Sequence, residues 1–231
     1  MTTLTTTTTP VQRVSTLTGD LIVPLQRGYL SDESYAVAAL ARLRRGAGKD
    51  ASQMPDLWGL ADTGPLYDRP AEGGRPLSEG QLIRAVNAVH TALTLWALHQ
   101  QSRGAAMHRP GSRTAPRALG AAVRQMMPPG EIAEPIRKRL VRAGTAPGLT
   151  ALSQRLRELI LLLRGADIPL DYALLAGQLY SWQEPTGREA VRQMWGRSYH
   201  SYRAPEHAEA DSPAAAVGTD TINDLTDKDA S

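Results

Sequence analysis

The chain has 231 residues, contains no cysteine and no phenylalanine, and carries a formal net charge of +3 at pH 7. This length suits one ordinary domain or two small ones, and the absence of cysteine excludes disulfides, thiolate metal sites and a thiol nucleophile. The first residues lack the basic and apolar regions of a signal peptide, and the longest strongly apolar run, 159–163, is far shorter than the ~20 residues that span a bilayer. We therefore expect a soluble, cytoplasmic protein without a membrane partner.

The charge is unevenly distributed along the chain. Residues 205–231 carry seven acidic side chains and one lysine, a net of −6, whereas residues 21–204 carry 24 basic and 15 acidic side chains, a net of +9. Residues 81–130 contain six arginines and neither aspartate nor glutamate. A region of one sign attracts a polyanion. A solvated run of arginines, or arginines paired with acids elsewhere in the fold, would give the same pattern.

Both ends of the chain are predicted to be disordered, because the Thr-rich segment 1–14 and the acidic segment 205–231 can bury little apolar surface. Between them the apolar residues recur with the period of a helix, and no alternating segment of useful length occurs. The sequence therefore predicts an all-α fold. Two small helical bundles, 15–110 and 111–204, are expected to pack together, with the join near the Gly- and Pro-rich residues 104–116.

The first predicted helix covers residues 31–45, with Ser31 as its N-cap candidate and Gly46 as its end. Ser78 and Gln81 have the spacing of a capping box, which predicts the start of a long helix. Trp58, in the segment between these helices, is interpreted as an anchor for a connecting loop.

Shorter helices are predicted near 117–127 and 131–143, followed by a strongly amphipathic helix that Gly165 closes. Pro169 suits the first turn of the next helix, and the last helix is predicted to follow Pro185. The whole region after the break is thus expected to be helical.

Three histidines, His90, His99 and His108, recur every nine residues. Nine residues turn a helix by half a circle beyond whole turns, so the first two point to opposite faces, and Gly104 separates the third from the helix. Ser102 lies near two of them, but no acid of the surrounding segment completes a metal set or orients a catalytic base. Unless such an acid comes from elsewhere in the fold, we predict no metal, no cofactor, no catalysis and no small-molecule substrate.

The aromatic side chains are predicted to lie inside, because Trp96, Trp182 and Trp195 fall on the apolar stripes of their helices. Buried rings argue against base stacking as the main mode of binding. Arginine and polar side chains directed at phosphates remain, a mode that gives affinity with little sequence information. The polar cluster in "WALHQQSRGAAMHRPG" is accordingly interpreted as a helix end that offers donors to a phosphate backbone.

Five stretches of residues 31–203 carry a resemblance to a known family. They are "ALARLRRGAGKD", "WALHQQSRGAAMHRPG", "ALGAAVRQM", "RELILLLRGADIPLDYALLAGQLYSWQ" and "VRQMWGRSYH". In order and spacing the sequence resembles CasB, the small subunit of the type I-E CRISPR surveillance complex, Cascade. The chain departs from the family at Ser153, Gln154 and Arg155, where members often carry a histidine, and at positions where members carry phenylalanine.

The resemblance implies a helical protein of two small bundles that is present as a pair within the complex and contacts other Cascade subunits. It implies binding to the guide RNA–target DNA hybrid and to the displaced DNA strand without sequence preference, and no catalysis. The motif match carries over Arg44, Arg45, Arg142 and Arg157 as nucleic-acid-binding residues. Charge and position add further members to this predicted set: Arg42, Lys49, Arg103, His108, Arg117, Arg124, Arg139 and Arg155.

Two other classes of protein stay open on the sequence alone. A helix-turn-helix DNA-binding transcriptional regulator would read an operator with residues around 166–200, although Trp195 and Tyr202 would then occupy the reading face. A nuclease would need clustered carboxylates to hold metal ions, and the basic region 81–130 has none.

Overall fold

The computed structural model describes residues 8–57, 59–69, 75–113 and 115–202. Within these ranges the chain is all-α, with no β-strand and one isolated parallel bridge between His108 and Leu170. The predicted fold class is confirmed. Residues 1–7, Trp58 and the segment 205–231 lie outside the described residues, so the expectations for them stay predictions.

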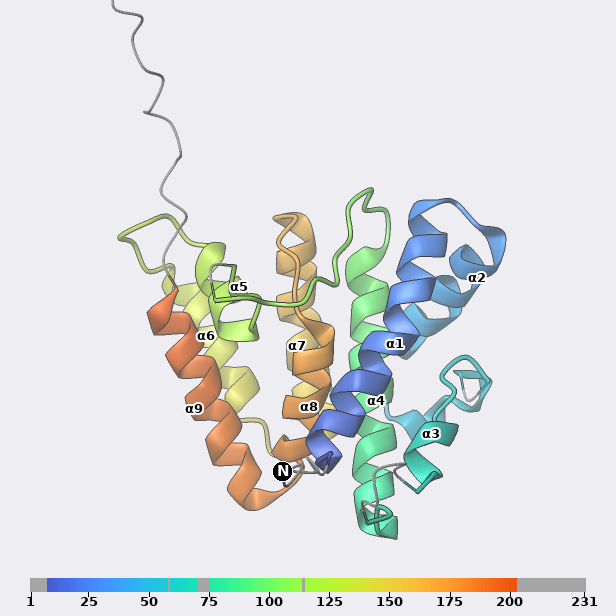
Figure 1. Cartoon of the computed structure of the whole chain (residues 1–231). Coiled ribbons are helices and arrows are strands. Elements are labelled where there is room, and N and C mark those ends of the chain that lie inside the picture. The colour runs from blue at the N-terminus through green and yellow to red at the C-terminus, as the bar shows by residue number, and fades with distance from the viewer. Residues whose placement is uncertain (1–7, 58, 70–74, 114, 203–231) are drawn as a thin grey trace, which may run out of the picture.

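The helices are arranged side by side with their ends at two opposite faces of the molecule (Figure 1). They are α1 (Pro10–Leu30), α2 (Ser34–Leu43), α3 (Gly64–Tyr67), α4 (Glu79–Gln100), α5 (Leu119–Gln125), α6 (Glu134–Gly144), α7 (Leu149–Gly165), α8 (Tyr172–Trp182) and α9 (Pro185–Ser201). Short 3-10 helices η1 (Arg44–Gly46), η2 (Ala51–Gln53) and η3 (Pro55–Leu57) link α2 to α3. Figure 1 shows α6 and α9 on one side, α2 and α3 on the other, and α4, α7, α8 and α1 between them.

Helix α1 begins at Pro10, so the prediction of a disordered tail over residues 1–14 is wrong for its last five residues. Thr9 caps the helix: its Oγ1 accepts from the Gln12 N–H, and the Gln12 Oε1 accepts from the Thr9 N–H. Val14 is fully buried against the core. With Leu17 and Ile22 it belongs to an apolar stripe at helical spacing, and packing of this stripe against α8, α2 and α4 stabilises the helix.

Two predicted helix starts were wrong, and each has a local reason. Ser31 closes α1, because its N–H bonds the Arg27 carbonyl at 3.1 Å, and α2 begins only at Ser34. Helix α8 begins at Tyr172, because Asp171 caps it by accepting from the Leu174 N–H at 2.9 Å. Pro169 therefore lies in the preceding connection.

Other predicted boundaries are confirmed. The Ser78–Gln81 capping box opens α4, with the Ser78 N–H bonded to the Gln81 Oε1 at 2.9 Å. Pro185 is the first residue of α9, and α7 ends at Gly165. The two short helices occur as α5 and α6, each starting two to three residues later than predicted.

One hydrophobic cluster joins the helices. Trp96 of α4, Leu156 of α7, Trp182 of α8 and Trp195 of α9 belong to it, and each is 2% exposed or less. The prediction that these tryptophans are internal is confirmed. The division into bundles 15–110 and 111–204 stays a prediction, because the cluster itself marks no boundary between them.

The connection after α4 is fixed by a buried polar network. The Gln26 carboxamide bonds both backbone groups of His108, accepting from its N–H at 2.8 Å and donating to its carbonyl at 3.0 Å. The His108 Nδ1 accepts from the Tyr172 N–H at 3.1 Å, and the Tyr172 hydroxyl lies 2.9 Å from the His99 Nδ1. Burial lowers the pKa of His99 to about 3 and also lowers the pKa of His108.

These shifts predict acid sensitivity. A histidine with an ordinary pKa near 6.5 in the unfolded chain and a lower one when folded binds a proton preferentially in the unfolded state. Stability is then complete above pH 6.5 and falls as the pH drops toward 3. His99 alone should account for a loss of about 2 kcal/mol in the free energy of unfolding between about pH 6.5 and about pH 5. Urea unfolding of wild type and His99→Gln over this range measures the difference in slope; equal slopes would contradict it.

Candidate nucleic-acid interface

The turn after α2 places three cations at the surface. Arg44, Arg45 and Lys49 are exposed. Gly46 holds the turn close to the core, since a Cβ there would lie 2.8 Å from Leu57 Cδ1 and 2.9 Å from Thr94 Cγ2. Position 46 therefore accepts only glycine without displacing a core side chain.

The same turn lies against α7. Gly48 has φ +85°, and a Cβ added to it would lie 3.3 Å from Arg157 Cδ and 3.7 Å from Gln154 Cα. Arg157 is exposed. The cations of the turn and Arg157 thus come together, although more than a hundred residues separate them in sequence.

A second contact extends this group from α7 to α6. The Arg155 Nη1 donates to the Arg142 carbonyl near the end of α6, and the Arg142 side chain is exposed. Arg139, one turn earlier in α6, donates to the Pro135 carbonyl at 3.2 Å. The two contacts link the segments in pairs, because Arg155 and Arg157 lie two residues apart and point about 200° apart around α7. We call the cations of these three segments the basic strip, and its members are Arg44, Arg45, Lys49, Arg142, Arg155 and Arg157.

The basic strip is not neutralised by described carboxylates. The ion pairs within the described ranges join Arg84 to Glu184, Arg103 to Asp167 and Arg137 to Glu134, and none involves a member of the strip. Asp50 follows Lys49 directly, but its carboxylate accepts from the Ser52 N–H at 3.0 Å and caps η2. The hydrogen bonds from Ser52 lower the pKa of Asp50.

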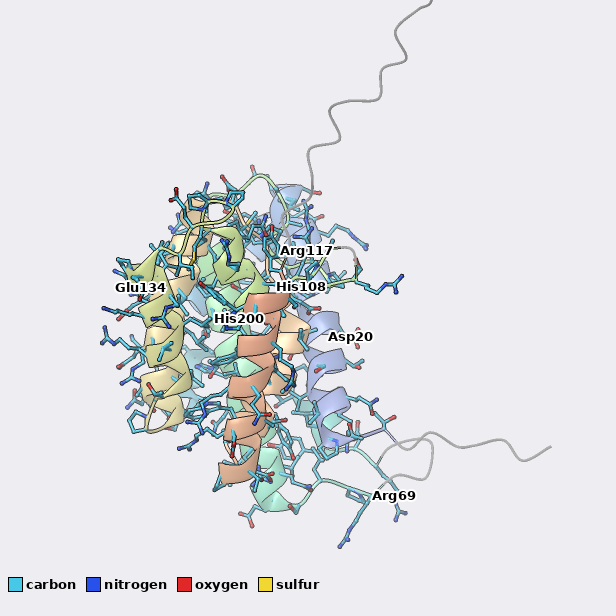
Figure 2. The ribbon with its side chains drawn as sticks, turned by 90° about the vertical axis from the view of Figure 1, so that its left-hand side faces the viewer. Asp20, Arg69, His108, Arg117, Glu134 and His200 are labelled. Carbon is cyan, nitrogen blue, oxygen red and sulfur yellow. The ribbon has the colours of Figure 1, made fainter. Side chains whose placement is uncertain are left out.

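A separate cationic group lies where α5 begins. Gly111 packs against Arg117, and the Arg117 carbonyl accepts from the Asp171 N–H at 2.9 Å. Burial and the neighbouring Arg109 lower the pKa of Arg117. Arg124 donates to the carbonyls of Met127 and Pro128. We call Arg109, Arg117 and Arg124 the Arg117 cluster; Figure 2 shows Arg117 near the end of the molecule opposite Arg69.

The structure corrects the interpretation of "WALHQQSRGAAMHRPG" as a group of phosphate donors. His108 is 3% exposed, and His99 and Gln100 are fully buried. His108 holds the connection to α8 and presents no free surface to a phosphate, so its prediction as a binding residue was wrong. Arg103 is half-buried and forms an ion pair with Asp167 at 2.9 Å.

Of the other predicted residues, Arg42 is exposed in the last turn of α2 without a described contact to the strip. Arg109, which the structure brings to Arg117, was missed by the sequence analysis. The available signal was its place in the acid-free segment 81–130.

The described residues also bear on the requirements of a metal site and of a membrane span. No three histidine, aspartate or glutamate side chains among them lie together as metal ligands, and no described helix is long and apolar enough to cross a membrane. A cavity of about 550 Å³ between α4 and residues 51–67 is lined mainly by apolar side chains such as Leu57 and Ile83, with Glu79 as its carboxylate.

Comparison with known proteins agrees with a helical protein of this kind. The family model of the CRISPR-associated protein Cse2 matches residues 39–200, and the chain belongs to this family. A crystal structure of CasB from Thermobifida fusca is 48% identical, with a TM-score of 0.72, over 82% of this chain and 98% of that chain. The resemblance to CasB seen in the sequence is thus confirmed.

A second solved structure, of a CRISPR RNA-guided surveillance complex, contains a chain with a TM-score of 0.58 and 21% identity, over 81% of this chain and 93% of that chain. This likeness shows a shared fold. No curated protein sequence matches the chain.

The turn that carries the strip gives a prediction. Gly48→Ala forces a β-carbon into a left-handed backbone and against Arg157, so the free energy of unfolding should fall by about 1–3 kcal/mol. Gly196→Ala is the matched control, because a Cβ there meets nothing within 4 Å and α9 is helical around it. Chemical unfolding measures both variants, and an equal effect of the two would contradict the assignment.

Proposed function

We propose that the protein is a non-catalytic small subunit of a type I-E Cascade complex. In this role it binds the guide RNA–target DNA hybrid and the displaced DNA strand through their phosphates, without sequence specificity. The observation that carries the proposal is the basic strip: six cations from three segments that two contacts link in pairs, and none of the six forms an ion pair with a described carboxylate. Membership of the Cse2 family supports the setting.

The mechanism follows from the energetics of strand exchange. Opening a duplex to pair one strand with guide RNA is a near-balanced exchange, so contacts to the backbones can tip it, as described for another RNA-guided effector. Guanidinium groups suit this task because they bind phosphate in a bidentate manner and stay charged. Trp96, Trp182 and Trp195 are buried and cannot stack on bases, and the exposed rings of Tyr35 and Tyr67 belong to α2 and α3, outside the basic strip. Contacts to phosphates alone do not distinguish one sequence from another.

The partners belong to the same proposal. The chain contacts other Cascade subunits and a second copy of itself, and it acts on no small molecule. The surveillance complex in which a chain of the same fold occurs supports assembly with other components. Six cations alone give modest affinity at physiological salt, so neighbouring subunits complete the binding track.

No observation favours the transcriptional regulator. Trp195 and Tyr199 of α9 are 2% and 5% exposed and pack into the core, so this face of the helix is not available to a DNA groove.

Removing four strip cations tests the proposal. Arg44, Arg45, Arg142 and Arg157 changed together to Ala should weaken target binding by the assembled complex on all sequences alike. The slope of log affinity against log salt should flatten by about 0.9 for each phosphate that the variant no longer neutralises. Fluorescence anisotropy on several unrelated targets measures both quantities.

The control removes the same charge elsewhere. Arg27, Arg69, Arg75 and Arg197 are exposed and lie outside the predicted set, and changing these four to Ala should leave the slope nearly unchanged. Equal weakening by the two quadruple variants, or an effect of the strip variant on one target sequence alone, would refute the proposal.

A further inference from the structure

The described chain ends beside the Arg117 cluster. Tyr202 is the last described residue, and it lines a cavity of about 470 Å³ together with Arg124 and His200. Burial raises the pKa of Tyr202 against the opposing effect of Arg124 and Arg117. Figure 2 shows Arg117 and His200 toward the same end of the molecule. The segment 203–231 therefore starts within reach of these arginines.

Described carboxylates leave the Arg117 cluster positively charged. Asp171 is bonded to the cluster through its backbone, and both of its carboxylate oxygens accept from other backbone groups: Oδ2 from the Gly111 N–H at 3.0 Å, and Oδ1 from the Leu174 N–H at 2.9 Å. The ion pairs of the described residues do not include Arg109, Arg117 or Arg124. An anionic partner would thus find three arginines that form no ion pair with a described carboxylate.

The chain itself supplies such a partner. Residues 205–231 hold seven acids against one lysine. In general, ten residues of flexible chain span about 18 Å, comparable with three turns of a helix at about 16 Å. Glu206, Glu209 and Asp211 follow Tyr202 within this distance. A tether of this length gives an effective concentration of the order of millimolar.

We propose that the acidic segment 203–231 docks on the Arg117 cluster of its own chain and competes there with nucleic acid. The docking itself follows from the charges and the short tether. The competition rests on the proposed function and on the sequence prediction that Arg117 and Arg124 are among the residues that contact phosphates. The consequence is selectivity. The tail shields the free subunit from the cell's random nucleic acid, and a hybrid held in place by neighbouring subunits displaces it.

A spin label tests the docking without any nucleic acid. The chain has no cysteine, so Ser212→Cys provides a single attachment site. At low salt the label should broaden the amide signals of α5 and of the last turn of α9, and at about 1 M salt, where the Debye length is about 3 Å, the signals should recover.

Two controls sharpen the label experiment. A neutral-tail variant, with its two glutamates changed to Gln and its five aspartates to Asn, should show no broadening. Labelled chains without isotope, mixed with isotope-enriched chains without label, should leave the signals sharp. Broadening that survives in the neutral tail, or that arises only between separate molecules, would overturn the proposal.

Binding of random-sequence single-stranded DNA tests the competition. At about 50 mM salt the neutral-tail variant should bind about tenfold more tightly than wild type, and the gain should vanish at high salt. The gain should also vanish when Arg109 and Arg117 are changed to Ala, a variant checked for folding by circular dichroism. The gain in affinity should persist when the tail is neutralised in the control variant, in which Arg27, Arg69, Arg75 and Arg197 are changed to Ala.

The outcomes separate the two proposals. A gain that persists in full without Arg109 and Arg117 would show a diffuse charge effect and overturn the docking site. Equal DNA binding by wild type and neutral tail would overturn the competition. If neither form bound DNA at about 50 mM salt, the competition would be overturned, while the spin label would still decide the docking and the assembled complex would still decide the proposed function.

Discussion

The side-chain amide of Gln26 is the contact on which the path of the chain past Arg109 and Arg117 depends. It accepts from the His108 N–H and from the Trp96 indole N–H, and donates to the His108 carbonyl. A polar group buried among tryptophan and leucine side chains is costly unless its partners are present, so the three bonds stabilise one path of the chain against others. Through the imidazole of His108 this path reaches the first residue of α8. Arg109 directly follows His108, and the Arg117 carbonyl accepts from the N–H of Asp171, the residue before Tyr172. The buried network therefore fixes the backbone at both arginines.

The basic strip depends on a different constraint, the close packing of a turn. Gly46 and Gly48 allow the chain to pass between α4 and α7, where a side chain would meet Thr94 or Arg157. This passage brings Lys49 beside a helix that lies a hundred residues further along the chain. The strip is therefore a product of tertiary structure, and apolar packing brings its cations together despite their mutual repulsion.

Local rules predicted part of the fold well. The capping box at Ser78 and the proline at 185 act within one helical turn, and both were correct. Thr9, Pro10 and Gln12 carry the same kind of signal at the start of α1, so that helix was also within reach of the sequence. The helix starts predicted from Ser31 and Pro169 were wrong because other residues occupy the N-cap positions. Glu33 is the N-cap of α2, and Asp171 is the N-cap of α8. His108 failed for a nonlocal reason, since its partners are Gln26 and Tyr172, far away in sequence.

The two kinds of arginine differ in what holds them, and this difference bears on function. Arg13, Arg84 and Arg103 are fixed by carbonyls, carboxylates or a tyrosine ring, and each joins parts of the core that are distant in sequence. Arg44, Arg45 and Arg157 lie on the surface with no described acid to hold them. A mobile guanidinium group adapts to phosphates at many spacings, which favours binding to a backbone over reading of a base edge. In the proposed function, indifference to sequence would follow from leaving these cations unpaired, because a fixed bidentate fork selects one geometry and, with it, some sequences over others.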